Sequence, residues 1–482
     1  MSTAYGHYIA GEWTGAADAV PSINPSNIAD VVGLYARGSA HDVDAAVAAA
    51  AGAFPRWSRS VPFDRGQILR KVGLEIESRQ QELAELIARE EGKTLPDALG
   101  EVVRAGQVFE FFAGETLRIG GENLAALRPD VTAEITREPL GVVGVITPWN
   151  IPFLIPAWKI ASALAYGNTV VFKPSELVPA CAWILTDMIA RAGIPSGVFN
   201  LILGRGSVIG QRLLDHPDVA AITFTGSVPT GRRVAASAVA GETMKKFQLE
   251  LGGKSPLVVL DDADLEHAVD CAIDGAFFGT GQKCTASSRL IVTDEIHDRF
   301  VGRLQEQLST LVVDDARKAG TDIGPVVDKS QLDQDLSYID IGRSEGARLV
   351  SGGERLKRDH EGYYLSPALF VDAAPAMRIA REEIFGPVAA VIRVRNYDEA
   401  LAVANDTSFG LSSAICTTSL KYANHFKRNS DAGLVKVNLP TTGADFHLPF
   451  GGRKASSYGA REQGAYAREF FTQVKTAYQL AL

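Results

Sequence analysis

Hydrophobic residues recur with two different periods along this chain, and each period predicts a different kind of element. Residues 41–54, 63–92 and 95–117 carry apolar positions at helical spacing. The first run is rich in alanine and follows Ser39, a residue type that caps helices. These runs predict three amphipathic helices without obvious chemistry, and residues 1–36 before them predict short strands joined by turns.

From residue 141 onward, short apolar runs alternate with helical stretches. Strands are predicted at 141–146, 168–172, 198–203, 219–225 and 256–260. Helices such as 156–166 and 179–192 separate them, which is the rhythm of βαβ units on a parallel sheet. Such a sheet commonly binds a dinucleotide at the carboxyl ends of its strands. This part of the chain is therefore predicted to be α/β and to bind a cofactor.

The rest of the chain predicts a second α/β segment and a small β element. Residues 261–450 contain a helix ahead of Cys284, a strand at 289–293 and a helix around 295–311. Two further stretches, VTAEITREP at 131–139 and EFFTQVKTAYQL near the C-terminus, alternate polar and apolar side chains as strands do.

Composition and charge limit the class of protein. The 482 residues are 46% hydrophobic and carry a formal net charge of −9, which argues against a nucleic-acid or anionic-membrane partner. The N-terminus has no basic segment followed by an apolar one, and no run approaches the roughly 18 apolar residues of a membrane span, so a cytoplasmic protein is expected. Cys181, Cys271 and Cys416 fall in helical or strand patterns and are predicted to be core. No Cys or His pair has metal-ligand spacing, so no metal is predicted.

The fourth cysteine, Cys284, has a different setting. It lies in FFGTGQKCTASSR, between glycines and small hydroxyl residues, whereas a packing cysteine is usually surrounded by apolar residues. Lys283, and the dipole of a helix if one begins near Thr285, would favour the nucleophilic thiolate. A small residue in a tight turn would give the same local pattern. The stretch makes Cys284 a candidate nucleophile.

Two polar residues at predicted strand ends are candidates for the same chemistry. Glu250 interrupts an apolar run just before Gly252 and Gly253, so its carboxylate is expected at the end of a strand, where a general base can stand. Asn150 closes GVVGVITPWN, and Pro148 ends the strand before it. An amide in that position can donate to a developing oxyanion, although an Asx turn is an equal alternative.

Seven short motifs occur along the chain in this order: TPWNIPF at 147–153, VVFKPSE at 170–176, FTGSVPTG at 224–231, LELGGKSP at 249–256, GQKC at 281–284, EEIFGPV at 382–388 and PFGGRKASSYG at 449–459. Together they resemble the signatures of the aldehyde dehydrogenase superfamily, and the likeness covers nearly the whole chain. The stretches around IPAWKIASALAYGNTVV and GTGQKCTASSR, and the one from 432 to 464, resemble the branch of bacterial 2-oxoglutarate semialdehyde (2,5-dioxopentanoate) dehydrogenases.

The resemblance implies a fold and an assembly. The expected fold class is α/β, with a Rossmann-like cofactor domain, an α/β catalytic domain and a small β element for bridging or oligomerisation. The expected boundaries are 1–117 and 141–252 for the NAD(P)-binding domain, 253–460 for the catalytic domain, and 118–140 with 465–482 for the β element. In the family the C-terminal strand pairs with a neighbouring subunit, so a homodimer or homotetramer is expected.

The resemblance also implies NAD or NADP as cofactor. Lys173 and Glu176 lie where the family binds the adenosine ribose. A carboxylate there accepts hydrogen bonds from both ribose hydroxyls of NAD and repels the 2′-phosphate of NADP, although related enzymes use NADP with the lysine as phosphate partner; NAD is favoured. By resemblance Glu383 binds the nicotinamide ribose and Phe385 packs beside the ring. The remaining expected cofactor residues are Ile146, Thr147, Pro148, Trp149, Ser175, Gly206, Phe224, Thr225, Gly226, Ser227 and Leu251.

A mechanism follows from the same resemblance. Cys284 attacks an aldehyde, Asn150 and the Cys284 backbone N–H hold the oxyanion, and hydride loss to the cofactor leaves a thioester. Glu250 then activates the water that hydrolyses the thioester. Relatives that transfer the acyl group to coenzyme A lack this glutamate, so a free acid is the expected product.

The sequence leaves the identity of the aldehyde substrate open. A semialdehyde such as that of 2-oxoglutarate carries a carboxylate, which requires charged or multiple donors. Phe153 and Trp158 lie in an apolar stretch where some carboxylate-binding relatives have amide and arginine side chains, so an aromatic or aliphatic aldehyde, or succinate semialdehyde, stays an alternative. Candidate substrate-binding residues are Phe153, Trp158, Arg289, Thr441, Thr442, His447 and Phe450. A structural ion pair is an equal alternative for Arg289, and a surface position is an equal alternative for His447. A catalytically silent relative, and a thiol-dependent esterase side activity of Cys284, are further alternatives.

Overall fold

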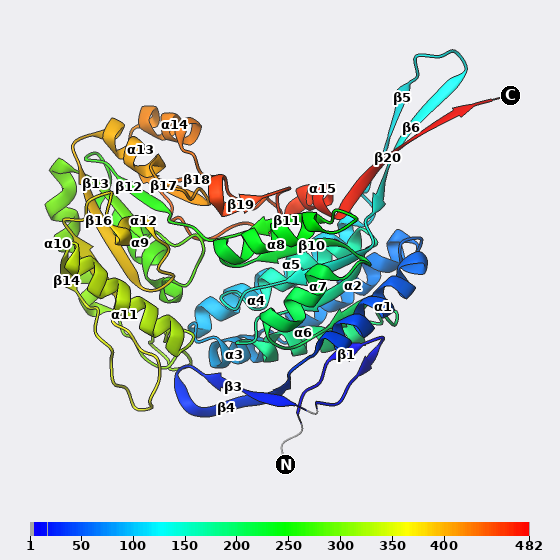
Figure 1. Ribbon diagram of the computed structural model, residues 1–482. Coiled ribbons are helices and arrows are strands. Elements are labelled where there is room, and N and C mark those ends of the chain that lie inside the picture. Colours follow the sequence, from blue (N-terminus) through cyan, green and yellow to red (C-terminus); the bar gives the residue numbers. More distant parts are fainter. Residues whose placement is uncertain (1–3, 17, 482) are drawn as a thin grey trace.

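Two sheets, each packed between helices, form the two lobes of the computed structural model, which describes residues 4–16 and 18–481 (Figure 1). The eight-stranded sheet of the first lobe has the order β19-β11-β10-β7-β8-β9-β1-β2. Its inner strands, from β11 to β9, run parallel. The strands of this sheet are β1 (Tyr8–Ile9), β2 (Glu12–Trp13), β7 (Val142–Ile146), β8 (Thr169–Lys173), β9 (Phe199–Leu201), β10 (Val219–Thr225), β11 (Lys246–Glu250) and β19 (Ser457–Tyr458).

The seven-stranded sheet of the second lobe has the order β14-β15-β16-β13-β12-β17-β18 and is parallel except for the β14–β15 pair. Alternate residues of a strand face opposite layers of core, as Leu257 and Val258 of β12 do. Its strands are β12 (Pro256–Val259), β13 (Arg289–Thr293), β14 (Arg348–Ser351), β15 (Ala368–Val371), β16 (Val388–Val394), β17 (Ser412–Cys416) and β18 (Leu434–Val437).

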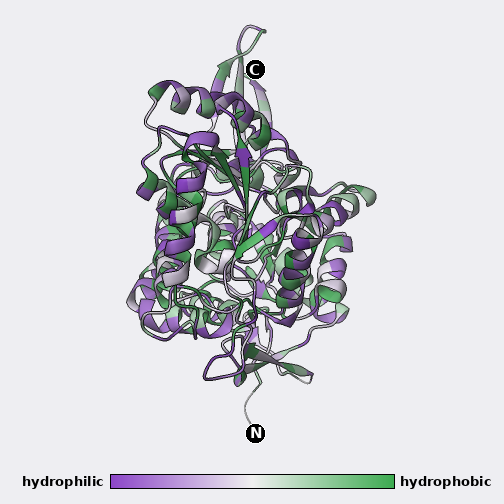
Figure 2. Ribbon diagram, turned by 90° about the vertical axis from the view of Figure 1, so that its left-hand side faces the viewer, coloured by the Kyte–Doolittle hydropathy of each residue, from purple (hydrophilic) through white to green (hydrophobic). Residues whose placement is uncertain are grey.

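Helices cover both faces of each sheet, and Figure 2 shows the apolar strands inside and more polar segments outside. The helices of the first lobe are α1 (Ala40–Trp57), α2 (Pro62–Ser78), α3 (Gln80–Glu90), α4 (Leu95–Glu115), α5 (Leu154–Ala165), α6 (Pro179–Arg191), α7 (Gln211–Asp215), α8 (Val228–Ala240) and α15 (Arg468–Phe471). Those of the second are α9 (Leu265–Ala276), α10 (Asp294–Thr310), α11 (Lys329–Ser344), α12 (Arg378–Arg381), α13 (Tyr397–Asn405) and α14 (Leu420–Asn429). Among the described residues, none of the helices has the length and apolar character needed to cross a membrane.

The predicted elements are present, with two differences. The helical run 63–92 is divided between α2 and α3, because Arg79 has a backbone conformation outside the helical region. The strand predicted at 256–260 lies in the second sheet, as β12. The last parallel strand of the first sheet is β11 instead. The chain crosses between the lobes at Gly252 and Gly253, and the periodicity of a buried strand does not report which sheet it joins.

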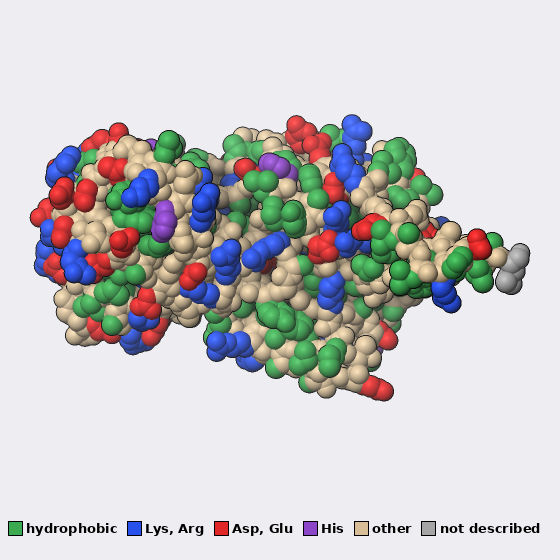
Figure 3. Space-filling view, turned by 90° about the horizontal axis from the view of Figure 1, so that it is seen from above, with side chains coloured by type: hydrophobic (Ala, Val, Ile, Leu, Met, Phe, Trp, Pro, Cys, Tyr) green, Lys and Arg blue, Asp and Glu red, His purple; other side chains and the backbone are tan. Residues whose placement is uncertain are grey.

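An arm of three antiparallel strands projects from the first lobe (Figure 1). It is formed by β5 (Glu122–Ala125), β6 (Val131–Pro139) and β20 (Thr472–Leu480), and β20 pairs with β6 along its whole length. Seen from above, it extends as a narrow projection from the body, with apolar side chains among charged ones (Figure 3). Leu124, Val474, Tyr478 and Leu480 of the arm are exposed.

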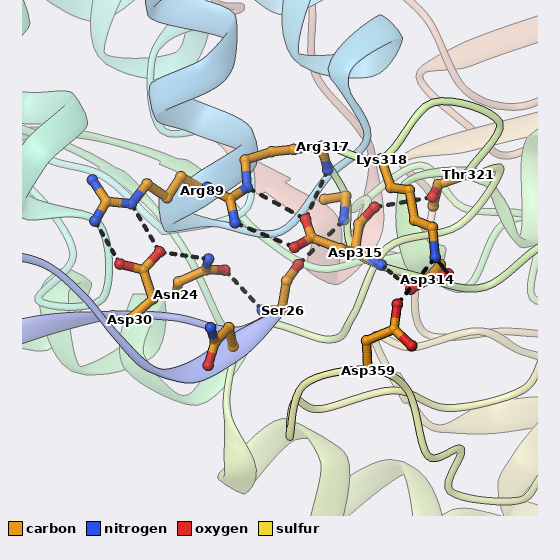
Figure 4. A network of polar contacts seen from close by, with 12 residues as sticks. Asn24, Ser26, Asp30, Arg89, Asp314, Asp315, Arg317, Lys318, Thr321 and Asp359 are labelled. Carbon is orange, nitrogen blue, oxygen red and sulfur yellow. Dashed lines mark hydrogen bonds and ion pairs between the residues drawn. The ribbon is translucent and has the colours of Figure 1, made fainter.

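The N-terminal hairpin connects the two lobes. Its strands are β3 (Ala19–Asn24) and β4 (Asn27–Ala36). Asp30 of this hairpin pairs with Arg89 of α3 at 2.6 Å, while Ser26 accepts a hydrogen bond from the Ala316 backbone N–H in a loop of the second lobe (Figure 4). Through these contacts the hairpin holds α3 and the 314–318 loop in fixed relation, beside the start of α4.

Candidate active site

Two cavities meet at the junction of the lobes. The strand-end cavity, of about 260 Å³, is lined by residues that follow β7, β10 and β11, together with Glu383 and Phe385. The helix-side cavity, of about 270 Å³, is lined by residues of α4 and α5 and by the 442–450 loop. Both cavities are lined by Asn150 and Cys284, and Glu250 lines the helix-side cavity. The three candidate catalytic residues therefore lie around one space.

Cys284 lies in a tight turn that its neighbours make possible. Gly279, Thr280 and Gly281 before it all have positive φ values of 63°, 58° and 63°. A side chain at Gly281 would collide with the Gly386 carbonyl oxygen, and one at Gly253 with the Cys284 carbonyl oxygen. These glycines let the backbone of the turn pack closely enough to present the thiol to both cavities.

The structure contradicts the predicted activation of the thiolate. No helix begins at Thr285, so no helix dipole acts on the sulfur. Burial, and then the nearby carboxylates of Glu250 and Glu383, raise the pKa of the Cys284 thiol to about 12. The thiol is therefore protonated at neutral pH, and its activation requires a base or a positive charge nearby.

A buried ion pair between the α3–α4 loop and α4 positions Asn150, which lies beyond the end of β7. Lys93 Nζ donates to the Asn150 carbonyl oxygen at 2.7 Å and to Glu101 Oε2 at 2.7 Å. Glu101 Oε1 accepts the backbone N–H groups of Phe153 and Leu154 at the start of α5. The Asn150 side chain donates to the Gln282 carbonyl oxygen at 2.9 Å. The helices that seemed to carry no chemistry thus hold the loop that bears the amide.

Glu250 is the last residue of β11, as the sequence predicts, and it is buried. Its Oε2 accepts a hydrogen bond from Ser457 Oγ at 2.8 Å. Burial, followed by the charge of Glu462, raises the pKa of the Glu250 carboxyl well above its usual value. A carboxylate with a raised pKa is a better proton acceptor near neutral pH, which suits a general base.

Behind Glu250 lies a buried polar network that sequence reasoning missed. Glu462 forms an ion pair with Lys159 of α5, and Trp158 Nε1 donates to its other oxygen at 2.6 Å. Lys159 Nζ also donates to Thr223 Oγ1 of β10 at 2.7 Å. Only tertiary packing joins these residues, since about 300 positions separate Lys159 from Glu462.

Most predicted cofactor residues line the strand-end cavity: Pro148, Trp149, Thr225, Gly226, Ser227, Leu251, Glu383 and Phe385. The rings of Trp149 and Phe385 meet edge to face, with centroids 5.4 Å apart. Glu383 Oε1 accepts the Gly253 backbone N–H at 2.8 Å, and burial raises the pKa of Glu383 to about 7. Gly226 and Ser227 lead into α8, in agreement with the predicted helix opening.

Two buried hydroxyls in this region fit a polar ligand. Thr147 Oγ1 and Thr225 Oγ1 have no hydrogen-bond partner among the described residues, and an unpaired buried polar atom costs free energy. A side chain at Gly226 or Gly252 would collide with Phe224 or Glu383, so glycine at these positions lets the cavity wall pack closely. The donor set fits a dinucleotide with ribose and nicotinamide groups.

The remaining predicted cofactor residues lie farther along the sheet. Lys173 ends β8, where its buried Nζ donates to the Pro174 carbonyl oxygen, and burial lowers its pKa to about 8. Glu176 is exposed, and Ser175 Oγ accepts the Leu177 backbone N–H. Gly206 lies beside Lys173 Nζ. Ile146 and Phe224 are core residues at the ends of β7 and β10.

The predicted substrate residues separate into two groups. Trp158, Thr442 and Phe450 line the helix-side cavity, and the rings of Trp158 and Phe450 lie 5.8 Å apart. Four others do not line it. Phe153 is buried in the core, Thr441 donates to the Thr285 carbonyl oxygen, His447 is exposed, and Arg289 donates to the carbonyl oxygens of Val403 and Ala404.

These four placements correct the sequence prediction. Arg289 is fully buried, and its two Nη groups donate to the backbone oxygens of Ala404 and Val403, so it is a structural cation. Cavity-lining residues that the sequence did not reveal come from α4, from the turn before Cys284 and from three loops: Lys93, Asp97, Glu101, Arg104, Gln282, Lys283, Phe446 and Gln463. The helical pattern marks such positions as one face of an amphipathic helix and gives no sign that the face borders a cavity.

The comparisons with known proteins agree on one family. The model of the aldehyde dehydrogenase family matches residues 13–477. The chain is 45% identical over 479 residues to alpha-ketoglutaric semialdehyde dehydrogenase of Bacillus subtilis and 42% identical to alpha-ketoglutarate semialdehyde dehydrogenase of Haloferax volcanii, with 98% of each chain covered in both cases. Betaine aldehyde dehydrogenase of Staphylococcus aureus, solved in complex with NAD+, has a similar structure at TM-score 0.96 and 34% identity, covering 99% of this chain and 95% of that one.

Proposed function

Because the chain belongs to the aldehyde dehydrogenase family, we propose that it oxidises an aldehyde to the free acid, with Cys284 as nucleophile, Glu250 as general base and Asn150 as oxyanion donor. The observation that carries these roles is the convergence of the three residues on one cavity, with Cys284 and Asn150 also lining the second. A nucleophile, an oxyanion donor and a base around one space, with a second site adjoining it, is the constellation that this chemistry requires.

In the first half of the reaction, Cys284 loses its proton to the Glu250 carboxylate and its sulfur bonds to the aldehyde carbon. The Asn150 amide and the Cys284 backbone N–H donate to the oxyanion of the thiohemiacetal. One such donor is worth roughly 3 kcal/mol when it is preorganised. The Lys93–Glu101 pair fixes the backbone that carries the amide, so the donor is in place before the substrate arrives.

Nicotinamide supplies a hydride acceptor when NAD(P) is bound, and this oxidation leaves a thioester on Cys284. Glu250 then releases this first proton to solvent. In the second half, the Glu250 carboxylate takes a proton from a water, whose oxygen attacks the thioester carbon and expels the Cys284 thiolate. The Ser457 hydroxyl orients the Glu250 carboxylate through its hydrogen bond to Oε2. The product is a free carboxylic acid.

Trp149, Thr225, Gly226, Ser227, Glu383 and Phe385 would hold the nicotinamide half of the cofactor. Lys173 and Glu176, after β8, would hold the adenosine ribose. We favour NAD over NADP, because the exposed Glu176 carboxylate would repel a 2′-phosphate and the pKa of Lys173 is lowered to about 8, which weakens it as a phosphate partner.

The proposed substrate is 2-oxoglutarate semialdehyde. Support comes from the printed names of the two curated relatives, at 45% and 42% identity. The helix-side cavity combines apolar walls, from Trp158, Phe446 and Phe450, with polar groups farther along α4, which suits a short chain with a charged end. An aromatic or aliphatic aldehyde is the second candidate, favoured by those same aromatic walls.

We propose a homodimer or homotetramer in which the arm takes part. The exposed apolar residues of β5 and β20 support this, because an isolated three-stranded ribbon leaves one edge of β20 unpaired. The free thiols of all four cysteines are compatible with a reducing compartment such as the cytoplasm.

The test is nicotinamide reduction with a panel of aldehydes, with NAD and with NADP, for wild type and Cys284→Ala. The panel contains 2-oxoglutarate semialdehyde, succinate semialdehyde, pentanal, hexanal, benzaldehyde and vanillin. We expect the highest kcat/KM for the oxo-acid semialdehyde and no turnover by the variant. If neutral aldehydes are the best substrates, the proposed substrate is wrong; if Cys284→Ala retains full activity, the proposed mechanism is wrong. Ester hydrolysis without nucleotide measures the side activity separately.

A further inference from the structure

The helix-side cavity contains one arginine whose charge no acidic side chain balances. Arg104 of α4 lines the cavity and is partly buried. Its Nε donates to the Gly100 carbonyl oxygen at 2.8 Å, one turn earlier in the same helix. No carboxylate of the described chain lies within ion-pair distance of its guanidinium. The Nη groups are therefore free to bind a ligand.

The position of Arg104 on α4 directs it toward the cavity. Asp97, Glu101 and Arg104 are spaced by four and three residues, so they share one face of the helix, and all three line the cavity. Glu101 holds the start of α5 next to Asn150. Phe111, two turns beyond Arg104 on the same face, meets Phe446 of the cavity wall edge to face at 6.0 Å. Arg104 thus lies between the Asn150 loop and the aromatic wall.

Two other cations line the cavity. Lys93 pairs with Glu101. Lys283 has no ion-pair partner within 4 Å among the described residues, but it directly precedes Cys284, so its ammonium lies on the segment that bears the nucleophile. Asp274 acts electrostatically on Lys436, whose Nζ donates to backbone carbonyl oxygens of the 442–443 segment. Arg104 is the other cation of the cavity without an ion pair among the described residues, and it lies on α4, on a different element from the nucleophile.

We propose that Arg104 binds the carboxylate at the far end of the aldehyde substrate and thereby selects ω-oxo acids over neutral aldehydes. The proposal rests on the proposed function. A planar guanidinium binds a carboxylate through two parallel hydrogen bonds, which gives both energy and orientation. The aldehyde end then reaches Cys284, and the methylene groups contact Leu154, Trp158 and Phe450. This role replaces the one that the sequence suggested for Arg289.

The test compares a charged and a neutral aldehyde of equal chain length, 2-oxoglutarate semialdehyde and pentanal, for wild type, Arg104→Met and Arg104→Lys. In Arg104→Met we expect KM for the oxo acid to rise about 10- to 100-fold, because a charge-assisted hydrogen-bonded contact is lost, and we expect kcat to change much less. Arg104→Lys should recover part of this loss. Turnover of pentanal should persist in every variant, which shows that the protein is folded and the reacting groups are intact.

A second readout does not depend on turnover of the charged substrate. Glutarate, an unreactive dicarboxylate, should inhibit pentanal oxidation competitively in wild type, and its inhibition constant should rise by a similar factor in Arg104→Met. Arg118→Met is the matched control, because Arg118 lies just beyond the end of α4 and pairs with Glu115 at the surface; it should behave as wild type.

The outcomes separate the two proposals. If wild type does not prefer the oxo acid to pentanal, the proposed substrate is wrong. If wild type prefers it and Arg104→Met keeps both this preference and the inhibition by glutarate, the role of Arg104 is overturned while the proposed function stands.

Discussion

The two cavities that meet at Cys284 have nearly equal volumes, about 260 and 270 Å³, but different construction. The strand-end cavity is lined largely by turns that directly follow β7, β10 and β11. The helix-side cavity is lined by the faces of α4 and α5 and by a distant loop. A turn at the end of a strand is placed by the sheet itself, whereas a helix face reaches a cavity only when the packing of the whole lobe is right. Residues of the first kind can be predicted from local motifs, whereas residues of the second kind, such as Glu101 and Arg104, show no such local motif.

The largest expected effect concerns Glu250, which accepts a proton in both halves of the proposed reaction. In Glu250→Gln, hydrolysis of the thioester loses its base, so steady-state turnover should fall by about 10² to 10⁴. Formation of the thioester needs only one proton transfer from Cys284, which bulk base can accept. A first turnover of reduced nicotinamide, stoichiometric with enzyme, is therefore expected in rapid-mixing measurements.

Cys284→Ala provides the control for this burst, because it removes the atom that carries the acyl group and should show none. If Glu250→Gln gives neither a burst nor turnover, Glu250 acts mainly in activating the thiol. If its steady-state rate equals that of wild type, Glu250 is not the base, and the network of Lys159 and Glu462 becomes the place to search for it.

The difference between the cavities also explains which site residues could be predicted from the sequence. Asn150, Glu250 and Cys284 follow strands or glycine turns, and their local patterns indicated polar groups presented at strand ends. Arg104 and Glu101 lie on α4 among apolar residues at helical spacing, a pattern that any amphipathic surface helix shows. For Arg289 the sequence leaves a substrate contact and a structural ion pair open. In the structure β13 directs this side chain into the second lobe, where carbonyl oxygens at the end of α13 accept its hydrogen bonds. The burial of the Arg289 side chain and the direction in which it points depend on contacts between segments far apart in the chain.

A second prediction tests whether α4 fixes the catalytic loop. In Lys93→Met, the buried Glu101 carboxylate loses its counter-ion, and the Asn150 carbonyl oxygen loses its donor. Breaking a buried pair by removing one partner costs about 3–5 kcal/mol of stability, so the urea midpoint should fall clearly. Activity of the folded variant should fall too, because the Asn150 amide is less well positioned.

Lys283→Met is the matched control in the same cavity. Lys283 has no ion-pair partner within 4 Å among the described residues, so its loss should change the free energy of unfolding by about 0.5 kcal/mol or less. Equal effects of the two substitutions would mean that the Lys93–Glu101 pair does not hold the loop. The geometry of the helix-side cavity would then not depend on this contact of α4.

The smallest expected effect concerns the strand-end cavity. Thr147 Oγ1 and Thr225 Oγ1 are buried without a partner, and we expect them to bond to the cofactor. Thr147→Val and Thr225→Val should each raise the Kd of NAD about three- to tenfold, the worth of one neutral hydrogen bond. Since valine has nearly the same shape and removes an unsatisfied hydroxyl, the stability of the free protein should stay the same or rise. Calorimetric titration gives Kd, and thermal unfolding without nucleotide gives stability.

Thr169→Val is the matched control for this pair. Thr169 is fully buried and its Oγ1 also has no partner among the described residues, but it is the first residue of β8 and lies at the opposite end of the sheet from the carboxyl ends of β7 and β10, where Thr147 and Thr225 lie. Its substitution should affect stability as the other two do and leave Kd unchanged. If all three variants bind NAD as wild type does, the hydroxyls at the strand ends do not contact the cofactor. If Thr169→Val weakens binding equally, the effect comes from the sheet as a whole, because a general change in its packing would act on all three positions alike.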